Sequence, residues 1–306
     1  MYKILLMLAF VTFNCFLNAQ QLQTETVVQL ENGLLETSGL IYLNGKIITH
    51  NDSGTEPELY EIDSLTGNIS RTVVVSNVTN TDWEDICIDA NYIYIGDFGN
   101  TAGARIDLKI YRVLISDYNS ALSDTVTAEI INFNFSNQTS FLPSLYITNF
   151  DVETLISFGD SLYVFTKNWG NSETSYYAIS KLPGNYSVSP KGIINSQGMV
   201  TGGVYNALSN EVVLCGYTFL HAFVIRISGF FQDDFESSII DRFNLAVGSS
   251  SIQIEGIVNY SNEGYYLSSE SHLSGNSELL KLAKVNDLGI NYNETDIAIL
   301  FPNPAT

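Results

Sequence analysis

Short apolar segments separated by polar turns occupy most of the chain, and many of them alternate apolar with polar residues. The segment Glu58–Asp63 is one example, and Ile69–Val75 follows it after a Thr66-Gly67 turn. Alternation of this kind predicts strands that are buried on one side. The apolar spacing typical of a helix occurs only in Gln232–Arg242, which predicts one short helix in an outer loop. The pattern therefore predicts an all-β protein.

A unit of two apolar strands recurs five times along the chain. Each copy begins with a turn that carries an acidic or small residue, and two short strands separated by a polar turn follow. The five copies pair residues 36–41 with 46–52, 82–86 with 92–100, 151–155 with 162–169, 200–204 with 212–217, and 253–257 with 265–270. Aligned on Leu40, Ile86, Leu155, Val204 and Ile257, neighbouring copies are 46 to 69 residues apart. Propeller blades have about 40–50 residues each, so these repeats, with inserted loops, indicate a β-propeller.

The repeats predict a single domain, residues 21–290, that forms a five-bladed propeller. Residues 108–114 and 128–135 would supply the outer strands of the second blade, whereas the last copy has a third strand at 278–285 and no fourth. We expect the N-terminal segment 26–30 to complete that last blade, which closes the ring and removes an open sheet edge. The alternative is six blades, with one hidden in the long second unit, but residues 136–150 contain little strand-like sequence.

The two ends of the chain carry targeting signals. Residues 1–20 predict a secretory signal peptide, because Lys3 precedes the apolar run Ile4–Phe13 and Asn18-Ala19-Gln20 offers a cleavage site. Residues 291–306 predict a linker and a further segment that contains Pro302-Asn303-Pro304-Ala305. This segment resembles the start of the C-terminal sorting domain of type IX secretion cargo. The two signals together predict a secreted or cell-surface protein.

The charge of the chain excludes some partners. Asp and Glu number 33 and Lys and Arg number 13, for a formal net charge of −20. Such a surface repels phosphate groups, so we expect neither nucleic acid nor anionic lipid as a partner. The apolar run at the N-terminus is shorter than the ~20 residues that cross a bilayer, so we expect no membrane insertion.

Acidic residues recur at the strand ends of the repeats. In a propeller blade, the start of the first strand and the end of the second lie on the same face, so these residues should crowd one mouth of the central channel. The first strands begin near Glu36, Glu84, Glu153 and Glu255, and the second strands end near Asp52, Asp97, Lys167 and Glu270. Five further polar residues belong to the same mouth: His50, Asn51, Asn100, Asn168 and His272.

A divalent cation is the natural partner of this mouth. Two carboxylates ~4 Å apart repel by about 4 kcal/mol at an effective dielectric of 20, and Lys167 is the one obvious base nearby. Carboxylate and amide oxygens favour calcium over zinc. We predict Asp52, Glu84, Asp97, Glu153, Glu255 and Glu270 as ligands. One alternative is a transition-metal site, because His50 and His272 belong to the same mouth. A simpler alternative is that the carboxylates are structural and accept backbone N–H groups.

Candidate ligand-binding residues at the mouth are His50, Asn51, Asn100, Lys167, Trp169 and His272. Trp169 lies in a Gly/Asn-rich loop, where an exposed aromatic ring suits a sugar, whereas Trp83 is better explained by packing between blades. Glu84 and Asp85 are the candidate general bases if the protein is an enzyme.

Four motifs together resemble a family of secreted bacterial β-propeller proteins, some of which carry type IX sorting domains. These are His50-Asn51-Asp52-Ser53-Gly54, Asp82-Trp83-Glu84-Asp85-Ile86, Gly96-Asp97-Phe98-Gly99-Asn100 and Asp151-Val152-Glu153-Thr154-Leu155. A fainter similarity, carried by Glu255-Gly256-Ile257 and the acidic mouth, is to esterase-like phytase propellers. That similarity implies calcium-dependent hydrolysis of phosphate esters. The mouth offers only Lys167 and Arg105 to hold a polyanion, which argues against a highly phosphorylated substrate.

Two functions follow from these observations. The first is a secreted, monomeric binding module with a calcium-binding channel mouth that recognises an extracellular glycan, a protein or a small molecule. The alternative is a metal-dependent secreted hydrolase of the phosphoesterase or esterase type. No nucleophile–base pair is evident in the sequence, which favours the binding module.

Overall fold

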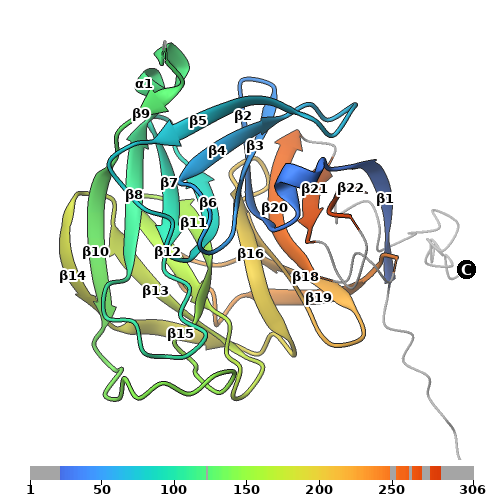
Figure 1. Ribbon diagram of the computed structural model, residues 1–306. Coiled ribbons are helices and arrows are strands. Elements are labelled where there is room, and N and C mark those ends of the chain that lie inside the picture. The colour runs from blue at the N-terminus through green and yellow to red at the C-terminus, as the bar shows by residue number, and fades with distance from the viewer. Residues whose placement is uncertain (1–20, 122, 249–252, 262–263, 271–275, 284–306) are drawn as a thin grey trace, which may run out of the picture.

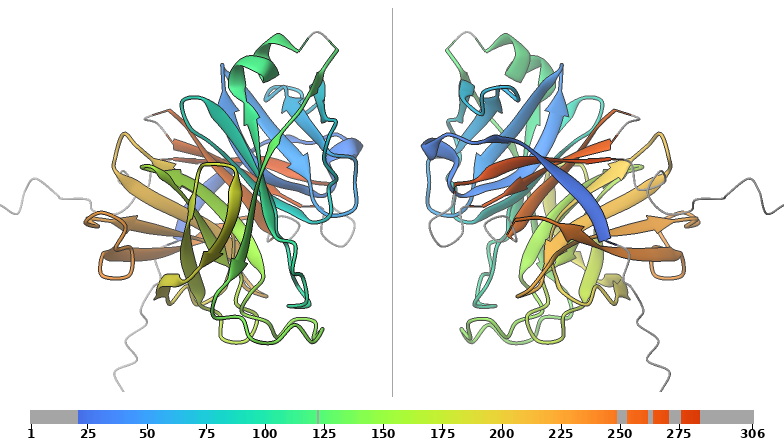
Figure 2. Two further views of the ribbon diagram at one scale, coloured as in Figure 1. Left: turned by 90° about the vertical axis from the view of Figure 1, so that its left-hand side faces the viewer. Right: turned by 90° about the vertical axis from the view of Figure 1, so that its right-hand side faces the viewer.

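The computed structural model describes residues 21–121, 123–248, 253–261, 264–270 and 276–283 (Figure 1). These residues form an all-β, propeller-like fold built from antiparallel strands that follow one another along the chain. The helices of the described part are α1 (Ile115–Ser120) and the 3-10 turn η1 (Asn32–Leu34). Figure 2 shows α1 projecting from one end of the molecule. None of the described helices has the length and apolar character that crossing a bilayer requires.

Three sheets share one plan, in which consecutive strands of the chain pair from the inside outwards. The first sheet contains β2 (Thr37–Leu43), β3 (Lys46–Asn51), β4 (Glu58–Ile62), β5 (Ile69–Val75) and β9 (Thr125–Val126). The second contains β6 (Trp83–Ile88), β7 (Tyr92–Asp97), β8 (Lys109–Leu114), β10 (Glu129–Phe135) and β14 (Gly184–Val188). The third contains β11 (Val152–Phe158), β12 (Ser161–Thr166), β13 (Thr174–Ser180) and β15 (Pro190–Ile194). The strands β9 and β14 are additions that pair in parallel with the outer edges of the first two sheets.

The fourth sheet has eight strands and is joined through the N-terminal strand. One half contains β16 (Met199–Asn206), β17 (Glu211–Tyr217), β18 (Ala222–Ser228) and β19 (Ile239–Ala246). The other half contains β20 (Ile254–Ser261), β21 (Gly264–Ser269) and β22 (Glu278–Ala283). The strand β1 (Gln21–Gln29) lies between the halves.

The strand β1 changes partner along its length. Residues 21–23 pair in parallel with 244–246 of β19, and residues 24–29 pair antiparallel with 278–282 of β22. The expected pairing of the N-terminal segment with the strand at 278–285 is therefore present, for example between Thr26 and Leu280. Residues 284 and 285 of that expectation lie outside the described residues.

The innermost strands surround a common channel. The strands β2, β6, β11, β16 and β20 contact one another in this order, and β20 contacts β2 again. The apolar core fills the space between neighbouring sheets rather than one central volume. Trp83 is fully buried between the first and second sheets, where it packs on His50 and Tyr111. This contact agrees with the packing role expected for Trp83.

The helix predicted at Gln232–Arg242 is wrong. Residues 232–238 form turns, and β19 begins at Ile239 and pairs with β18. Phe235 is fully buried against Tyr176 and Phe230 in the apolar core between the third sheet and the strands β16 to β18. The helix-like spacing therefore comes from Phe235 together with Ile239 and Ile240, the first residues of β19.

Both cysteines of the described chain, Cys87 and Cys215, are buried free thiols. Burial raises the pKa of each thiol well above its usual value, so little thiolate forms at neutral pH. We expect neither thiol to react with a thiol-specific chromogenic reagent in native buffer over minutes, and both to react in guanidinium chloride. Rapid reaction of one thiol in the folded chain starting at Gln21 would contradict this burial.

Candidate functional site

Each inner strand carries a β-bulge near its start, and the bulges direct side chains into the channel. Register shifts leave Glu84 of β6, Glu153 of β11, Thr201 of β16 and Glu255 of β20 without a direct partner on the next strand. A bulge interrupts the alternation of side chains and turns the extra residue toward a new direction. Glu84, Glu153 and Glu255 consequently converge. The register also shows that Gly203, not Val204, corresponds to Ile86 and Leu155, so the alignment of the fourth repeat on Val204 is one residue out.

A second ring of residues follows the second strand of each repeat. The backbone N–H of Asp52 donates to Glu36 O at 2.9 Å, that of Lys167 to Asp151 O at 2.7 Å, and that of Glu270 to Gln253 O at 3.0 Å. In the second repeat the equivalent donor is Phe98, whose N–H bonds to Asp82 O at 3.1 Å. These repeated bonds fix Asp52, Lys167 and Glu270 at the same height as the bulge glutamates.

The two rings enclose an acidic cavity of about 290 Å³ at the mouth of the channel. Its carboxylates are Asp52, Asp82, Glu84, Glu153, Glu255 and Glu270. The one basic side chain among its described lining residues is Lys167. Lys167 Nζ lies 3.2 Å from Glu153 Oε1 and 4.9 Å from the centre of the Trp169 ring. The side chains of Thr101, Tyr146 and Tyr217 contribute to the rim.

Carboxylate oxygens that line this acidic cavity, together with those of the buried Asp151, come close enough to share an ion. One oxygen each from Asp52, Asp82 and Glu84 lie within 4.8 Å of one another, and so do oxygens of Glu84, Asp151 and Glu153. Glu84 belongs to both groups, so it occupies the middle of the cluster. These five carboxylates are the residues that could hold a cation.

The carboxylates destabilise one another when they are charged. Burial raises the pKa of Asp52 to about 6 and that of Asp82 to about 7, and neighbouring carboxylates add to both shifts. Burial and the same neighbours hold the pKa values of Glu84 and Glu255 well above the usual range. Burial opposes the charge of Lys167, but Glu153 and the other carboxylates raise its pKa well above the usual value. The ammonium group of Lys167 alone therefore does not balance the negative charge of these carboxylates.

Two of the predicted carboxylates lie away from the acidic cavity. Asp97 pairs directly with Trp83 in the ladder, one residue before the position that faces the cavity. Its carboxylate forms an ion pair with Arg105 at 2.8 Å, and the Tyr111 hydroxyl and the Asp82 N–H donate to it at 2.9 and 3.2 Å. Side chains alternate between the two faces of a strand, so this one-residue difference makes the Asp97 side chain point away from the acidic cavity. Asp97 is a structural carboxylate here, and the prediction that it is a metal ligand is corrected.

Asp85 is also placed away from the acidic cavity. It follows the bulge, and its two oxygens accept the N–H groups of Ile86 and Leu155, both at 2.8 Å. The Leu155 bond links β6 to the neighbouring strand β11. Asp85 therefore joins two sheets, as the structural alternative expected, and it is not placed to act as a general base in the cavity.

Of the polar residues predicted at the mouth, some line the acidic cavity and others lie away from it. The His50 ring is fully buried, and Nδ1 lies 3.0 Å from Asn51 O. Burial lowers the pKa of His50 to about 4, so the ring is neutral. Asn51 and Asn100 donate to the backbone oxygens of Gly33 and Phe150, whereas Trp169 lines the cavity and donates to Asp151 Oδ2 at 2.7 Å. The structure therefore brings together Lys167 and Trp169 of this set, and His272 lies outside the described residues.

Several residues of the site were missing from the predicted ligands and binding residues, among them Asp82, Asp151, Tyr146 and Tyr217. Asp82 and Asp151 each precede a bulge glutamate by two residues, so the spacing Asp-x-Glu in the second and third repeats was an available signal. Tyr217 stands where the other repeats have Asp52, Lys167 and Glu270, which only the ladder register reveals.

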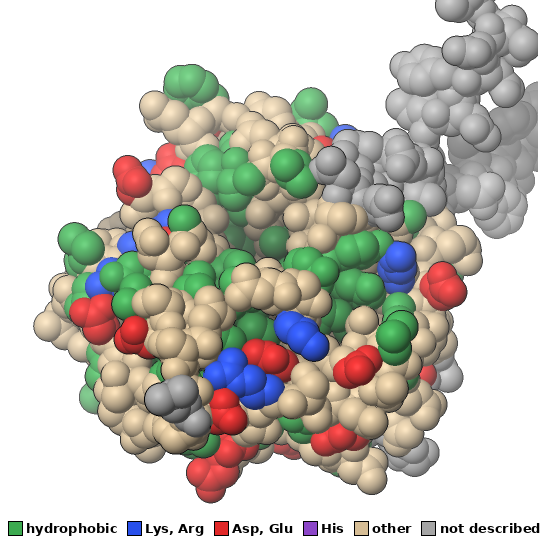
Figure 3. Space-filling view, turned by 90° about the horizontal axis from the view of Figure 1, so that it is seen from above, with side chains coloured by type: hydrophobic (Ala, Val, Ile, Leu, Met, Phe, Trp, Pro, Cys, Tyr) green, Lys and Arg blue, Asp and Glu red, His purple; other side chains and the backbone are tan. Residues whose placement is uncertain are grey.

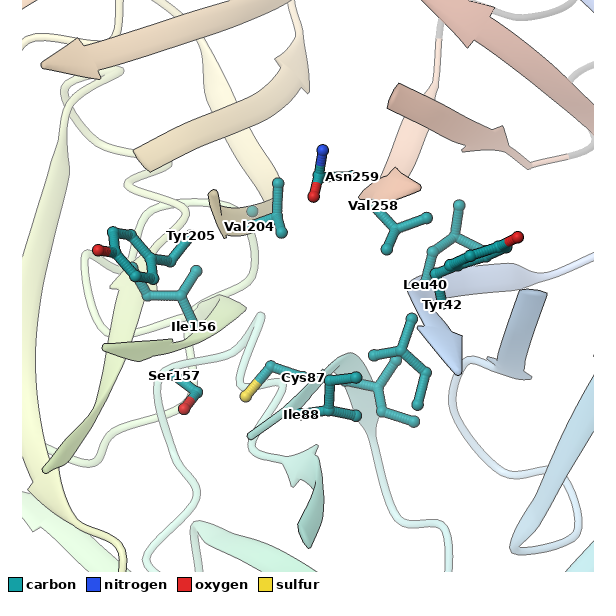
Figure 4. A pocket seen from close by; sticks show the side chains of 13 residues that line it. Leu40, Tyr42, Cys87, Ile88, Ile156, Ser157, Val204, Tyr205, Val258 and Asn259 are labelled. Carbon is teal, nitrogen blue, oxygen red and sulfur yellow. The ribbon is translucent and has the colours of Figure 1, made fainter. Parts of the chain in front are cut away.

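The opposite end of the channel is lined mostly by apolar residues and has no charged residue in its described lining. A cavity of about 250 Å³ there is lined by the later residues of all five inner strands, among them Leu40, Cys87, Ile156, Val204 and Val258 (Figure 4). On this face, which carries α1, hydrophobic side chains gather toward the middle (Figure 3). The channel thus has one charged mouth and one apolar mouth.

Comparison with known proteins yields no family. No family model and no curated protein matches the chain. Among solved structures, a "Hypothetical protein from leishmania major" is similar at a TM-score of 0.48 and 13% identity, over 85% of this chain and 90% of that one. The "Catalytic domain of Coprinopsis cinerea GH62 alpha-L-arabinofuranosidase" gives 0.47 and 11%, over 88% and 98%. "Kuenenia stuttgartiensis Hydrazine Synthase" gives 0.41 and 11%, over 78% and 75%. These values are too low to carry an inference about function.

Proposed function

We propose that the chain forms a five-bladed β-propeller closed by its N-terminal strand. The ring of contacts from β2 through β6, β11, β16 and β20 back to β2 supports this interpretation. The eight-stranded sheet then consists of two blades that β1 joins, since β1 is the outer strand of the last blade and touches the edge of the one before it.

The acidic cavity is proposed to bind calcium. The observation that carries this proposal is the position of Glu84, which is 6% exposed, belongs to both groups of converging oxygens, and has no hydrogen bond or ion pair to its side chain within the described residues. An unpaired buried carboxylate is costly, and a bound cation removes that cost. Oxygen ligands alone suit calcium, because zinc sites use histidine or cysteine. Asp52, Asp82, Glu84, Asp151 and Glu153 would hold the ion.

The proposed function is that of a binding module which recognises an extracellular ligand at this mouth. Ser53 lines the acidic cavity, but the nearby His50 ring is buried and directed to a backbone oxygen, so it is not paired with this hydroxyl. This arrangement favours binding over nucleophilic hydrolysis. A metal-dependent hydrolase that uses a carboxylate as general base is the alternative. Secretion is proposed from residues 1–20 and 291–306, which lie outside the described residues.

Calcium titration tests the proposal. We expect isothermal titration to show calcium binding by the chain that begins at Gln21, and millimolar calcium to raise the Tm above its value in EDTA. A ligand that binds only the folded chain adds about 2.7 kcal/mol at 100 times its Kd. The variant Glu84→Gln should lose both effects, and Glu25→Gln, which neutralises an exposed carboxylate on β1, should keep them.

Equal Tm values in calcium and EDTA for the unaltered chain would refute the calcium proposal. Turnover of ester or phosphoester substrates that requires calcium and is lost in Glu84→Gln would favour the hydrolase instead.

A further inference from the structure

A second cavity adjoins the acidic cavity, and its walls are aromatic. It has a volume of about 520 Å³. Tyr146 and Trp169 line both cavities, and Phe219 completes the aromatic wall from the turn after β17. Tyr146 is 61% exposed and Phe219 is 93% exposed. Large apolar side chains left open beside a cavity mark a surface that a ligand covers.

Three of the residues that line the aromatic cavity have a left-handed backbone conformation. Tyr146, Ser172 and Gln197 line it and have φ angles of 58°, 56° and 52°. Such angles are uncommon outside glycine and unfavourable for a bulky residue such as tyrosine. Backbone bonds hold these turns, since Tyr146 N–H donates to Thr101 O at 3.3 Å and Ser172 N–H donates to Asn168 O at 3.0 Å. Strain that the surroundings maintain in this way gathers at binding sites.

The chemistry of the lining selects a neutral ligand. The polar lining residues Ser172, Gln197 and Thr218 are uncharged, and no acidic or basic side chain lines this cavity among the described residues. An anion would find no base there, and an organic cation would find no carboxylate. On the side of the acidic cavity, Lys167 already lies over the Trp169 ring.

A sugar ring fits these features. One face of the ring presents C–H groups, which pack on the electron-rich face of an aromatic side chain, and its hydroxyl groups exchange hydrogen bonds with hydroxyl and amide groups. The aromatic rings of Tyr146 and Trp169 lie edge to face, with centres 4.8 Å apart, so they form a corner rather than a flat platform.

We propose that the cavity between Tyr146, Trp169 and Phe219 binds one ring of a neutral sugar chain, and that the adjoining ring enters the acidic cavity. This inference deepens the proposed function, on which it rests for the calcium ion beside the second ring. It identifies the extracellular ligand as an uncharged oligosaccharide.

Titration with hexasaccharides of equal length and different charge tests the proposal. The probes are cellohexaose, xylohexaose and mannohexaose as neutral chains, a galacturonic acid hexamer as the anion, and a glucosamine hexamer as the cation. Binding is followed by calorimetry and by the change in tryptophan fluorescence, which is assigned to Trp169 because Trp169 lines the cavity and Trp83 is buried away from it. We expect at least one neutral hexamer to bind and to change the fluorescence. Phe219→Ala should weaken that binding about tenfold.

Phe231→Ala is the matched control, since Phe231 is 79% exposed and does not line the cavity. It should bind the hexamer as the unaltered chain does, and both variants should bind calcium normally. Binding of charged hexamers alone, binding that Phe219→Ala leaves unchanged, or binding of no hexamer by the calcium-loaded chain would each overturn the inference. If a neutral hexamer binds through Phe219 and calcium does not bind at all, the sugar site stands and the calcium proposal fails.

Discussion

Removal of β1 is expected to unfold the whole domain rather than to loosen one edge. A chain that begins at Leu30 loses the ladders to both β19 and β22, and it loses Leu22, which is 1% exposed in the core between the two halves of the eight-stranded sheet. Two strand edges would then be open at once. Circular dichroism during urea unfolding should show the loss of the cooperative transition that the chain beginning at Gln21 displays.

A milder change provides the control for this truncation. Val27→Ser alters a side chain of β1 that is 36% exposed and keeps every ladder bond, so it should change the free energy of unfolding by less than about 0.5 kcal/mol. A truncated chain that unfolds cooperatively with unchanged stability would show that β1 does not hold the fourth sheet together.

Neutralising Asp97 and neutralising Glu84 are expected to have different effects on stability in EDTA. Asp97→Asn removes the charge that Arg105 pairs with in a fully buried position, and it should lower the free energy of unfolding by about 3 kcal/mol in calcium and in EDTA alike. Glu84→Gln removes a charge that other carboxylates repel, so stability in EDTA should stay the same or rise. Urea unfolding of both variants with calcium and with EDTA measures the four values.

The comparison separates the two kinds of buried carboxylate. If Asp97→Asn lost stability only in calcium, Asp97 would be a ligand after all. If Glu84→Gln lost equal stability under both conditions, Glu84 would serve the fold and not an ion.

The repeat pattern was sufficient to predict the inner strands of the five repeats and their order, but it did not predict the outer strands β13, β14, β15, β18 and β19. Ile69–Val75 was predicted with the bounds that β5 has, and residues 26–30 were correctly paired with 278–283 because the last repeat lacked a strand. Such predictions succeed because alternation and repetition are properties of short segments. The convergence of Glu84, Glu153 and Glu255 also followed, since all three stand at the same position of the repeat.

The register of the paired strands determines which way a side chain points, and the register could not be predicted from the sequence. Asp97 and Asp52 look equivalent at the end of their strands, yet the ladder pairs Asp97 with Trp83 and leaves Asp52 one residue further on. A shift of one residue reverses the side to which a strand residue points. The aromatic cavity was likewise beyond prediction as a whole, because Tyr146, Trp169 and Phe219 come from three separate loops that the fold alone brings together.

The place of β1 has a consequence for how the chain folds as it is made. The strand β1 pairs antiparallel with β22, which is made about 250 residues later, so this sheet cannot be completed until those residues have been synthesised. Pairings so distant in sequence slow folding and leave strand edges exposed in the meantime. Until β22 has been made, β1 lacks its antiparallel partner, and this part of the chain keeps a strand edge that is open to aggregation.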